Sequence, residues 1–471
     1  MAVQQIGANG RLTIDQVVID TLAAQFRGVV LKPGDAGYEE ARTVQNGLID
    51  RHPAAVVQCT GAADVIAAVN IAREHDLLLS VKGGGHNVAG NAVNDGGIVI
   101  DLSLMRAVHV DPRTRTARVQ GGATWAELDR ETQVFGLAAP GGLVSTTGVA
   151  GLTLHGGMGH LRRKHGLSID NLLSVDIVTA DGQLCTASAT EHPDLFWAVR
   201  GAGSNFGVVT SFEFRLHPVG PTVMLGATAY AMEDAPTVLR QWRDMLPSTP
   251  EELTPLSLFW SIPQGFPPEL VGIPVVIVVG LYAGPVKEGE TAVQWMRELA
   301  TPVIDLSGPD QYAHVQSGFD AFFPKGDLYY WKSTYVEEIS DEVLDHLCSL
   351  AAARPSPRTT MDIWPQMGAP MRVGAEETAF GRRPPYLVAF ESSWSNPAEN
   401  DANIAWARDA CTSMSRFPSS GIYLNFPGME GETEDLARRA YGANYDRLVE
   451  VKTTYDPGNL FRMNHNILPR R

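Results

Sequence analysis

The sequence predicts a two-lobed α+β protein, and three observations lead to this fold class. The chain has 471 residues, more than one hydrophobic core usually organises. The first part of the chain has the pattern of short strands joined by glycine-rich turns, and this pattern changes near Pro218. Residues 219–424 then alternate long strands with amphipathic helices, a pattern typical of an antiparallel sheet backed by helices.

The first part of the chain shows strand and helix patterns in close succession. Apolar residues at helical spacing predict helices over 62–75, 123–136 and 192–201, the last with Pro193 at its start and Gly201 after its end. Short apolar runs bounded by polar turns predict strands. These strands are expected at 54–59, 77–82, 98–105, 108–111, 117–122, 174–182 and 207–216.

The middle part has six expected strands and four expected helices. The strands are 223–231, 253–262, 273–284, 327–336, 359–367 and 386–394, and the helices are 237–246, 289–299, 340–353 and 400–414. The chain is expected to be helical again from 432 and to turn at the DPGN run. The strand aromatics have two open interpretations, a pocket wall or a half-buried sheet face. They are Phe259, Tyr282, Tyr329, Tyr330, Trp331 and Trp364.

Composition excludes several classes of function. The formal net charge of −16 disfavours partners with phosphate backbones and anionic membranes, and no apolar run is long enough to span a bilayer. The four cysteines, at 59, 185, 348 and 411, form no CxxC pair, which argues against a disulfide framework or a zinc site. The first 16 residues lack a secretory pattern. A cytoplasmic protein that binds neither nucleic acid nor membrane is expected.

Three glycine-rich stretches point to a ligand that touches the backbone at several places. The first, at 82–90, contains GGGH, where glycines allow positive φ and free N–H groups can hold phosphate oxygens beside Lys82. The second covers 141–159, and the third is RGAGSNFGVV at 200–209. None has the spacing of a Rossmann turn or a P-loop. A diphosphate-linked dinucleotide suits such an arrangement.

A collinear set of motifs resembles one known family from about residue 35 to the end. The motifs are HPAAVVQC, GGGHN, GGIVIDLSLM, VQGGATWAELD, GLAAPGG, TGVAGLTL, RKHGLSIDNL, VTADG, HPDLFWAVRGAGSNFGVVT and YDPGNLFRMNHNI. They resemble the berberine-bridge-enzyme-like FAD-linked oxidases of the vanillyl-alcohol-oxidase superfamily. The resemblance implies an FAD-binding lobe of the p-cresol-methylhydroxylase (PCMH) type from 1–218 and 425–471, with the C-terminal segment 425–471 packing on it. Residues 219–424 would form the substrate lobe.

The resemblance also implies how FAD is held. In that family the histidine of GGGH bonds to the flavin 8α-methyl group, and here it is His86. Many members add a second bond through a cysteine, but Val144 stands at that position, so a single attachment is expected. The expected cofactor-binding residues are Lys82, Gly83, Gly84, Gly85, His86, Asn87, Gly90, Pro140, Gly141, Val144, Thr146, Thr147, Gly148, Gly151, Leu154, His155, Gly157, Gly207, Val208, Val209, Tyr423, Asn425, Asn464 and His465.

The same resemblance implies residues for the chemistry. Tyr423 of a YxN motif or Glu391 on a strand would take a proton, and Thr147 stands where the family controls oxygen access. Tyrosine acting as a base needs a depressed pKa or a coupled acceptor, and both side chains also have structural interpretations. His155, His160 and His165 are five residues apart, a spacing that disfavours a shared metal.

Three functions remain open at this level. The first is an oxidase that transfers hydride from a small organic or natural-product substrate to flavin N5, with O₂ as acceptor. The second is a flavin-dependent cyclisation, rearrangement or oxygenation in secondary metabolism. The third is a binding protein that has lost catalysis, which the intact glycine loops and histidine disfavour. The substrate and the oligomeric state are not readable from the sequence.

Overall fold

The structure is a computed structural model that describes residues 4–6, 12–381, 384–429 and 433–470. The first 16 residues, which lack a secretory pattern, therefore lie partly outside the described residues. Residue 432, the expected start of the last helical region, is also outside them. Among the described residues, no helix is long and apolar enough to cross a lipid bilayer.

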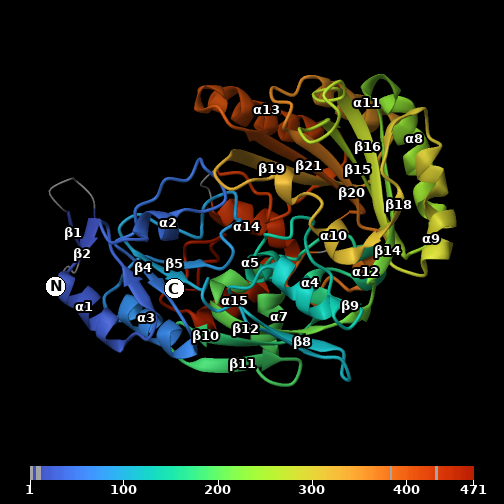
Figure 1. Cartoon of the computed structure of the whole chain (residues 1–471). Helices are drawn as coiled ribbons and strands as arrows, with labels where there is room; N and C mark the ends of the chain where they lie inside the picture. Colours follow the sequence, from blue (N-terminus) through green and yellow to red (C-terminus); the bar gives the residue numbers. More distant parts are fainter. Residues whose placement is uncertain (1–3, 7–11, 382–383, 430–432, 471) are drawn as a thin grey trace.

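Two larger sheets build the lobe formed by the N-terminal half of the chain (Figure 1). The first has the order β3 (Val29–Leu31), β4 (Ala55–Gln58), β6 (Ile98–Asp101) and β5 (Leu79–Lys82), with the last three strands parallel. The second is antiparallel, with the order β11 (Leu184–Ser188), β10 (Leu172–Thr179), β12 (Gly207–Arg215), β8 (Thr116–Gln120) and β7 (Val108–Asp111). The glycine-rich stretches are the connections between these strands.

Helices pack against these two sheets. They are α1 (Gln16–Gln25), α3 (Ala62–Glu74), α4 (Trp125–Gln133), α5 (Val149–Leu154) and α7 (Pro193–Ala202). The capping box of Thr124 and Glu127 starts α4 and satisfies its first free N–H groups. The helix ends before the predicted Gly136. Its first residue, Trp125, donates its backbone N–H to Thr147 O at 3.0 Å, which fixes the second glycine stretch.

One large antiparallel sheet forms the second lobe. Its strands run in the order β17 (Pro302–Asp305), β14 (Thr222–Ala231), β16 (Pro274–Tyr282), β15 (Leu253–Ser261), β20 (Thr360–Pro365), β21 (Tyr386–Trp394), β19 (Leu328–Val336) and β22 (Ser419–Ser420), and β18 (Gly308–Gln311) also pairs with β14. The outer face is covered by α8 (Ala235–Met245), α9 (Val286–Val293), α11 (Asp341–Ala352) and α13 (Asn400–Ser413) (Figure 1). The predicted antiparallel sheet backed by helices is confirmed.

Strand alternation separates the sheet aromatics into two groups. Phe259, Tyr282 and Tyr330 belong to the helix-covered core. Tyr329 and Trp331, the neighbours of Tyr330 along β19, instead line a cavity on the inner face together with Trp364. Each of the two interpretations of these aromatics therefore holds for half of the set.

The C-terminal helices return to the first lobe. Tyr441 of α14 (Thr433–Tyr441) and Leu448 of α15 (Tyr445–Tyr455) are buried in the same core as Trp197 of α7. The last segment follows, and Phe461 joins the core built on the four-stranded sheet. The chain thus begins and ends in one lobe and builds the other between.

Candidate active site

A large cavity lies where the two lobes meet. Its walls come from all three glycine-rich stretches, the inner face of the large sheet, and the tail residues Phe461, Met463, Asn464 and His465. The empty space inside it is about 1990 Å³, counting its open mouth. It is long enough to pass from the glycine stretches to the sheet, so one ligand can contact both lobes.

The two glycine loops approach each other so closely that no side chain fits between them. A Cβ on Gly84 would lie 2.4 Å from Gly148 N, and a Cβ on Gly148 would lie 2.4 Å from Gly84 N. Gly85 next to them has a φ of +69°, which favours glycine. Backbone atoms alone form this part of the cavity wall. Their N–H groups can therefore donate hydrogen bonds to a phosphate group.

His86 follows this wall and faces the cavity. Its Nε2 lies 3.1 Å from Thr146 Oγ1, and its Nδ1 lies 3.4 Å from Thr147 Oγ1. Burial lowers the pKa of the imidazole to about 4, so the ring is neutral at pH 7. A neutral ring keeps one nitrogen lone pair for bonding. Val144 lines the same cavity, and none of the four cysteines does.

Tyr423 lies at the junction of the lobes with its hydroxyl in the cavity wall. Its Oη accepts hydrogen bonds from Gly157 N at 3.2 Å and from Asn425 Nδ2 at 2.8 Å. Burial raises the pKa of the phenol to about 12, despite these donors. The phenol therefore keeps its proton at neutral pH, and this favours a hydrogen-bond donor over the free base considered from the sequence.

Two carboxyl groups stand on neighbouring strands opposite the glycine loops. Asp362 on β20 and Glu391 on β21 are only 6% and 5% exposed, and both line the cavity. Burial raises the pKa of both carboxyls, and repulsion from Asp362 adds to this at Glu391, whereas the polar side chains of Thr360 and Trp364 and the charge of Arg354 partly offset it at Asp362. Two carboxyls so placed do not both ionise readily near pH 7.

Because the pKa of Asp362 is raised in the folded protein, this residue makes the free energy of unfolding depend on pH. An unfolded aspartate ionises near pH 4, whereas the folded group resists ionisation, so stability falls as pH rises above that value. Asp362→Asn should therefore raise the free energy of unfolding at pH 8, by about 1.4 kcal/mol for each pH unit between the unfolded and folded pKa values, and so raise the apparent Tm. At pH 4 the substitution should change the Tm little. Thermal melts across this range check it, and an equal effect at both pH values would contradict it.

Comparison with known proteins identifies the chain. The family model for an FAD binding domain matches residues 53–188, and the model described as berberine and berberine like matches residues 422–468. The (R)-6-hydroxynicotine oxidase of Paenarthrobacter nicotinovorans is 32% identical over 459 residues, which cover 94% of this chain and 97% of that protein. The chain belongs to the berberine-like FAD-linked oxidoreductases.

Further relatives agree with this membership. An uncharacterized FAD-linked oxidoreductase of Bacillus subtilis is 30% identical and covers 95% of this chain and 98% of its own length. The crystal structure of 6-hydroxy-D-nicotine oxidase from Arthrobacter nicotinovorans superposes with a TM-score of 0.85 at 31% identity, covering 94% of this chain and 98% of that one. The predicted family, PCMH-type fold and enzyme class are confirmed, and FAD is the cofactor.

The cavity of this berberine-like oxidoreductase suits FAD. Its backbone wall offers N–H groups for the diphosphate, and the Oδ1 atom of Asn464 is buried without a partner among the described residues. Most residues expected to bind the cofactor line the cavity. They are Gly83, Gly84, Gly85, His86, Asn87, Val144, Thr147, Gly148, Gly151, Leu154, His155, Gly207, Val209, Tyr423, Asn425, Asn464 and His465, together with the expected catalytic Glu391.

Seven expected residues, Lys82 among them, do not line the cavity. The Nζ of Lys82 lies 3.0 Å from Asp101 Oδ2 in a buried ion pair and also donates to Ala41 O. The other six are likewise outside the cavity lining. They are Gly90, Pro140, Gly141, Thr146, Gly157 and Val208. Thr146 still reaches His86, and Gly157 still donates to Tyr423.

Several site residues were missed from the sequence. Asp362 was not singled out, although an acidic residue within the apolar strand 359–367 was a usable signal. Phe319 and Phe323 line the cavity from a loop, where no periodicity marks them.

His155 contacts Ser204 Oγ at 3.1 Å and lies edge-on to His465, with ring centroids 5.8 Å apart. No cluster of three or more potential metal ligands exists among the described residues.

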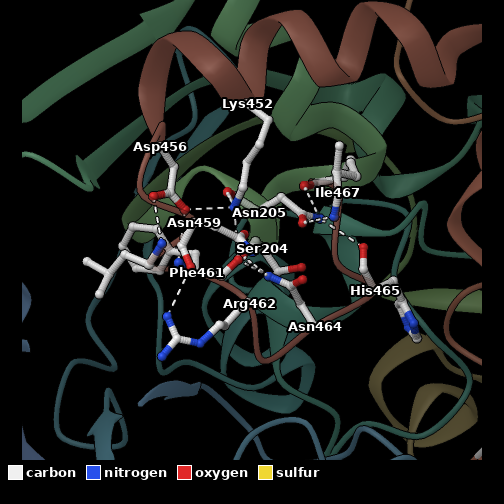
Figure 2. Close-up of polar contacts among 12 residues, drawn as sticks. Ser204, Asn205, Lys452, Asp456, Asn459, Phe461, Arg462, Asn464, His465 and Ile467 are labelled. Carbon is white, nitrogen blue, oxygen red and sulfur yellow. Dashed lines mark hydrogen bonds and ion pairs between the residues drawn. The ribbon is translucent and has the colours of Figure 1, made fainter. Parts of the chain in front are cut away.

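A buried network ties the tail of this berberine-like enzyme to the first lobe (Figure 2). Lys452 Nζ lies 2.7 Å from Asp456 Oδ2 and donates to Asn205 O at 2.8 Å and Phe461 O at 3.0 Å. Asn464 Nδ2 donates to Ser204 O at 2.7 Å. The network turns the chain after α15, so that Asn464 and His465 reach the cavity.

Breaking this ion pair should be costly because both partners are fully buried. Asp456→Ala leaves the Lys452 charge unpaired and removes the acceptor for the N–H groups of Leu460 and Phe461. We expect a loss of about 3–5 kcal/mol in the free energy of unfolding, measured by urea denaturation. Glu450→Gln, which breaks an exposed pair with Arg470, is the control and should cost under about 1 kcal/mol. Equal losses in both variants would contradict this.

Proposed function

We propose that this protein is an oxidase with a single covalent bond between His86 and its flavin. Hydride passes from a carbon of a small organic substrate to flavin N5, and O₂ then takes the electrons. The observation that carries the proposal is the position of His86, a neutral imidazole on the cavity wall directly after the glycine loop. A neutral imidazole is a competent nucleophile, whereas a protonated ring has no free lone pair.

The surroundings of His86 support one attachment rather than two. The hydroxyls of Thr146 and Thr147 lie within hydrogen-bond distance of its two ring nitrogens and orient the ring. Val144 offers no nucleophile, and no cysteine lines the cavity. FAD bound here is a two-electron oxidant, and the bond to His86 would keep it in place through many turnovers.

The remaining polar groups have distinct tasks in this proposal. The backbone N–H groups of the glycine loops hold the diphosphate. Tyr423, fixed by donors from Gly157 and Asn425, points its own proton toward a heteroatom of the substrate. The pair formed by Asp362 and Glu391 accepts the proton that the substrate loses on oxidation, because both buried carboxyl groups line the cavity.

The names of relatives support an oxidase outcome over cyclisation, rearrangement or oxygenation. Two of them are an (R)-6-hydroxynicotine oxidase, 32% identical, and a xylooligosaccharide oxidase from Thermothelomyces thermophilus, 30% identical over 444 residues. Both names describe oxidation of a small molecule. The two substrates differ chemically, so the names leave the substrate class of this chain to its own cavity.

The test is the fate of the flavin when the purified protein is precipitated with acid. We expect the yellow colour to remain in the pellet, and one H₂O₂ to appear for each substrate oxidised in air. Complete release of flavin into the supernatant would overturn the covalent bond. Turnover without peroxide would overturn the oxidase and favour one of the alternative outcomes.

A further inference from the structure

Two prolines face each other near one end of the pairing between β15 and β20. In that antiparallel pairing, Ser257 lies opposite Ile363. The same register, continued by two residues, places Pro255 opposite Pro365. A proline has no backbone N–H group, so neither of the two can donate to the carbonyl of the other. Backbone hydrogen bonds therefore cannot join the two strands at this position.

Both proline carbonyls nevertheless point into the gap between these strands. Ala283 N donates to Glu252 O on the β16 side of β15. Because the hydrogen-bonding side alternates along an antiparallel strand, Pro255, three residues on, turns its carbonyl toward β20. Gln366 donates its N–H on the β21 side, so the preceding Pro365 turns its carbonyl toward β15. Two buried acceptors are left without a backbone donor.

The guanidinium group of Arg162, on the one-turn helix α6 (Arg162–His165), supplies the missing donors. Its Nε donates to Pro365 O at 3.1 Å, and its Nη2 donates to Pro255 O at 3.3 Å. Its Nη1 donates to Gly159 O, in the second glycine-rich stretch, at 3.0 Å. The side chain is fully buried, and no carboxylate among the described residues forms an ion pair with it. Three carbonyl groups stabilise its charge instead.

Arg162 also packs against one wall residue of the cavity without lining the cavity itself. Its guanidinium carbon lies 5.1 Å from the centroid of the Trp364 ring, within the range of a cation–π contact. Trp364 lines the cavity and shares a face of β20 with Asp362, two residues earlier. The polar group of the Trp364 indole favours the ionised form of Asp362. Arg162 is thus one side chain away from a carboxyl group of the site.

We propose that Arg162 is a positioning residue of the active site. It joins β15 to β20 across the two prolines and holds the Trp364 ring in the orientation in which the indole acts on Asp362. The task requires the planar fork of a guanidinium group, because one rigid group must span two carbonyls, and lysine lacks this geometry. This inference deepens the proposed oxidase and rests on it only for the role of Asp362 in proton transfer.

The position of Trp364 can be measured without any substrate. The holoenzyme is prepared with 5-fluorotryptophan at its nine tryptophan positions, and Trp364→Phe identifies the ¹⁹F resonance of position 364. We expect Arg162→Met and Arg162→Lys each to shift this resonance by more than its linewidth. Circular dichroism checks the fold, and Arg162→Lys, which keeps the buried charge, carries the test if Arg162→Met does not fold.

The matched control is Arg163→Lys, the same change at the next residue of α6. Arg163 is also buried, but it donates to Leu246 O and Thr249 O, both at 3.0 Å. Its variant should leave the resonance of position 364 in place. An unchanged resonance in the Arg162 variants, or an equal shift in Arg163→Lys, would overturn the positioning role.

A pH titration of the same resonance tests the link to Asp362. The wild-type resonance should move with pH as Asp362 ionises, and Asp362→Asn should abolish this movement. In Arg162→Lys the midpoint should lie about one pH unit higher, because the carboxylate loses the help of a correctly placed indole. An unchanged midpoint would overturn the link. Release of the flavin by acid, or turnover without peroxide, overturns the proposed function alone, because neither result depends on the position of Trp364.

Discussion

His86→Ala should yield a protein from which acid removes all of the flavin. The variant loses the one nucleophile on the cavity wall at this point, since Val144 cannot form a bond and no cysteine lines the cavity. FAD still binds through the backbone of the glycine loops, so the purified variant should be yellow and should release FAD on precipitation. Spectra of pellet and supernatant measure this directly.

The matched control is His109→Ala, which removes an exposed histidine from β7 in the same lobe. Its flavin should stay in the pellet. The His86 variant should also be less stable to heat once free FAD is removed, because a ligand that can dissociate stabilises only in proportion to its concentration. Covalent flavin in the His86→Ala pellet would show that another residue forms the bond and would refute the assignment.

Tyr423→Phe should lower kcat/KM by about 10²-fold or more while the flavin stays attached. The change deletes one hydroxyl, to which Gly157 N and Asn425 Nδ2 both donate. Because those donors occupy the acceptor side of the oxygen, the Tyr423 proton is the part of the group available to the substrate. Its loss removes a hydrogen bond to the substrate heteroatom and leaves the Asn425 amide without its acceptor.

The pH profile distinguishes donation from base catalysis. With a pKa of about 12, the phenol remains protonated through pH 10, so the wild-type rate should show no rising alkaline limb from this group between pH 7 and 10. Tyr455→Phe, which removes a hydroxyl bonded to Asp194 outside the cavity, is the control and should retain full activity. An alkaline limb that disappears in Tyr423→Phe would instead establish the tyrosine as a base.

A feature of this site could be predicted from the sequence when its residues are adjacent in the chain. The glycine loop and His86 form one continuous segment, so their chemistry could be predicted from the sequence. The sequence predicts a phosphate contact for Lys82 because this residue precedes the glycines. Its ion-pair partner, Asp101, lies opposite it in the parallel pairing of β5 with β6, and that pairing depends on the folded sheet. No pattern along the chain marks such a pair.

The part of the cavity lined by the large sheet was harder to predict from the sequence. Glu391 was singled out alone, and the side of the strand that it faces was unreadable from sequence. Asp362 joins it only through the register of β20 with β21. The aromatics of β19 needed the structure as well, because Tyr330 enters the core while Tyr329 and Trp331 face the cavity. Long strands were predictable, whereas their partners and facing sides were not.

The buried pair of Lys452 and Asp456 has a consequence for how the protein is made. This pair and the segment after it complete a lobe whose first strands leave the ribosome some 400 residues earlier. While translation is under way, the nascent chain lacks Asn464 and His465, and its flavin site is open on one side. Cofactor capture is therefore expected to follow the synthesis of residues 452–465, which complete this side of the site.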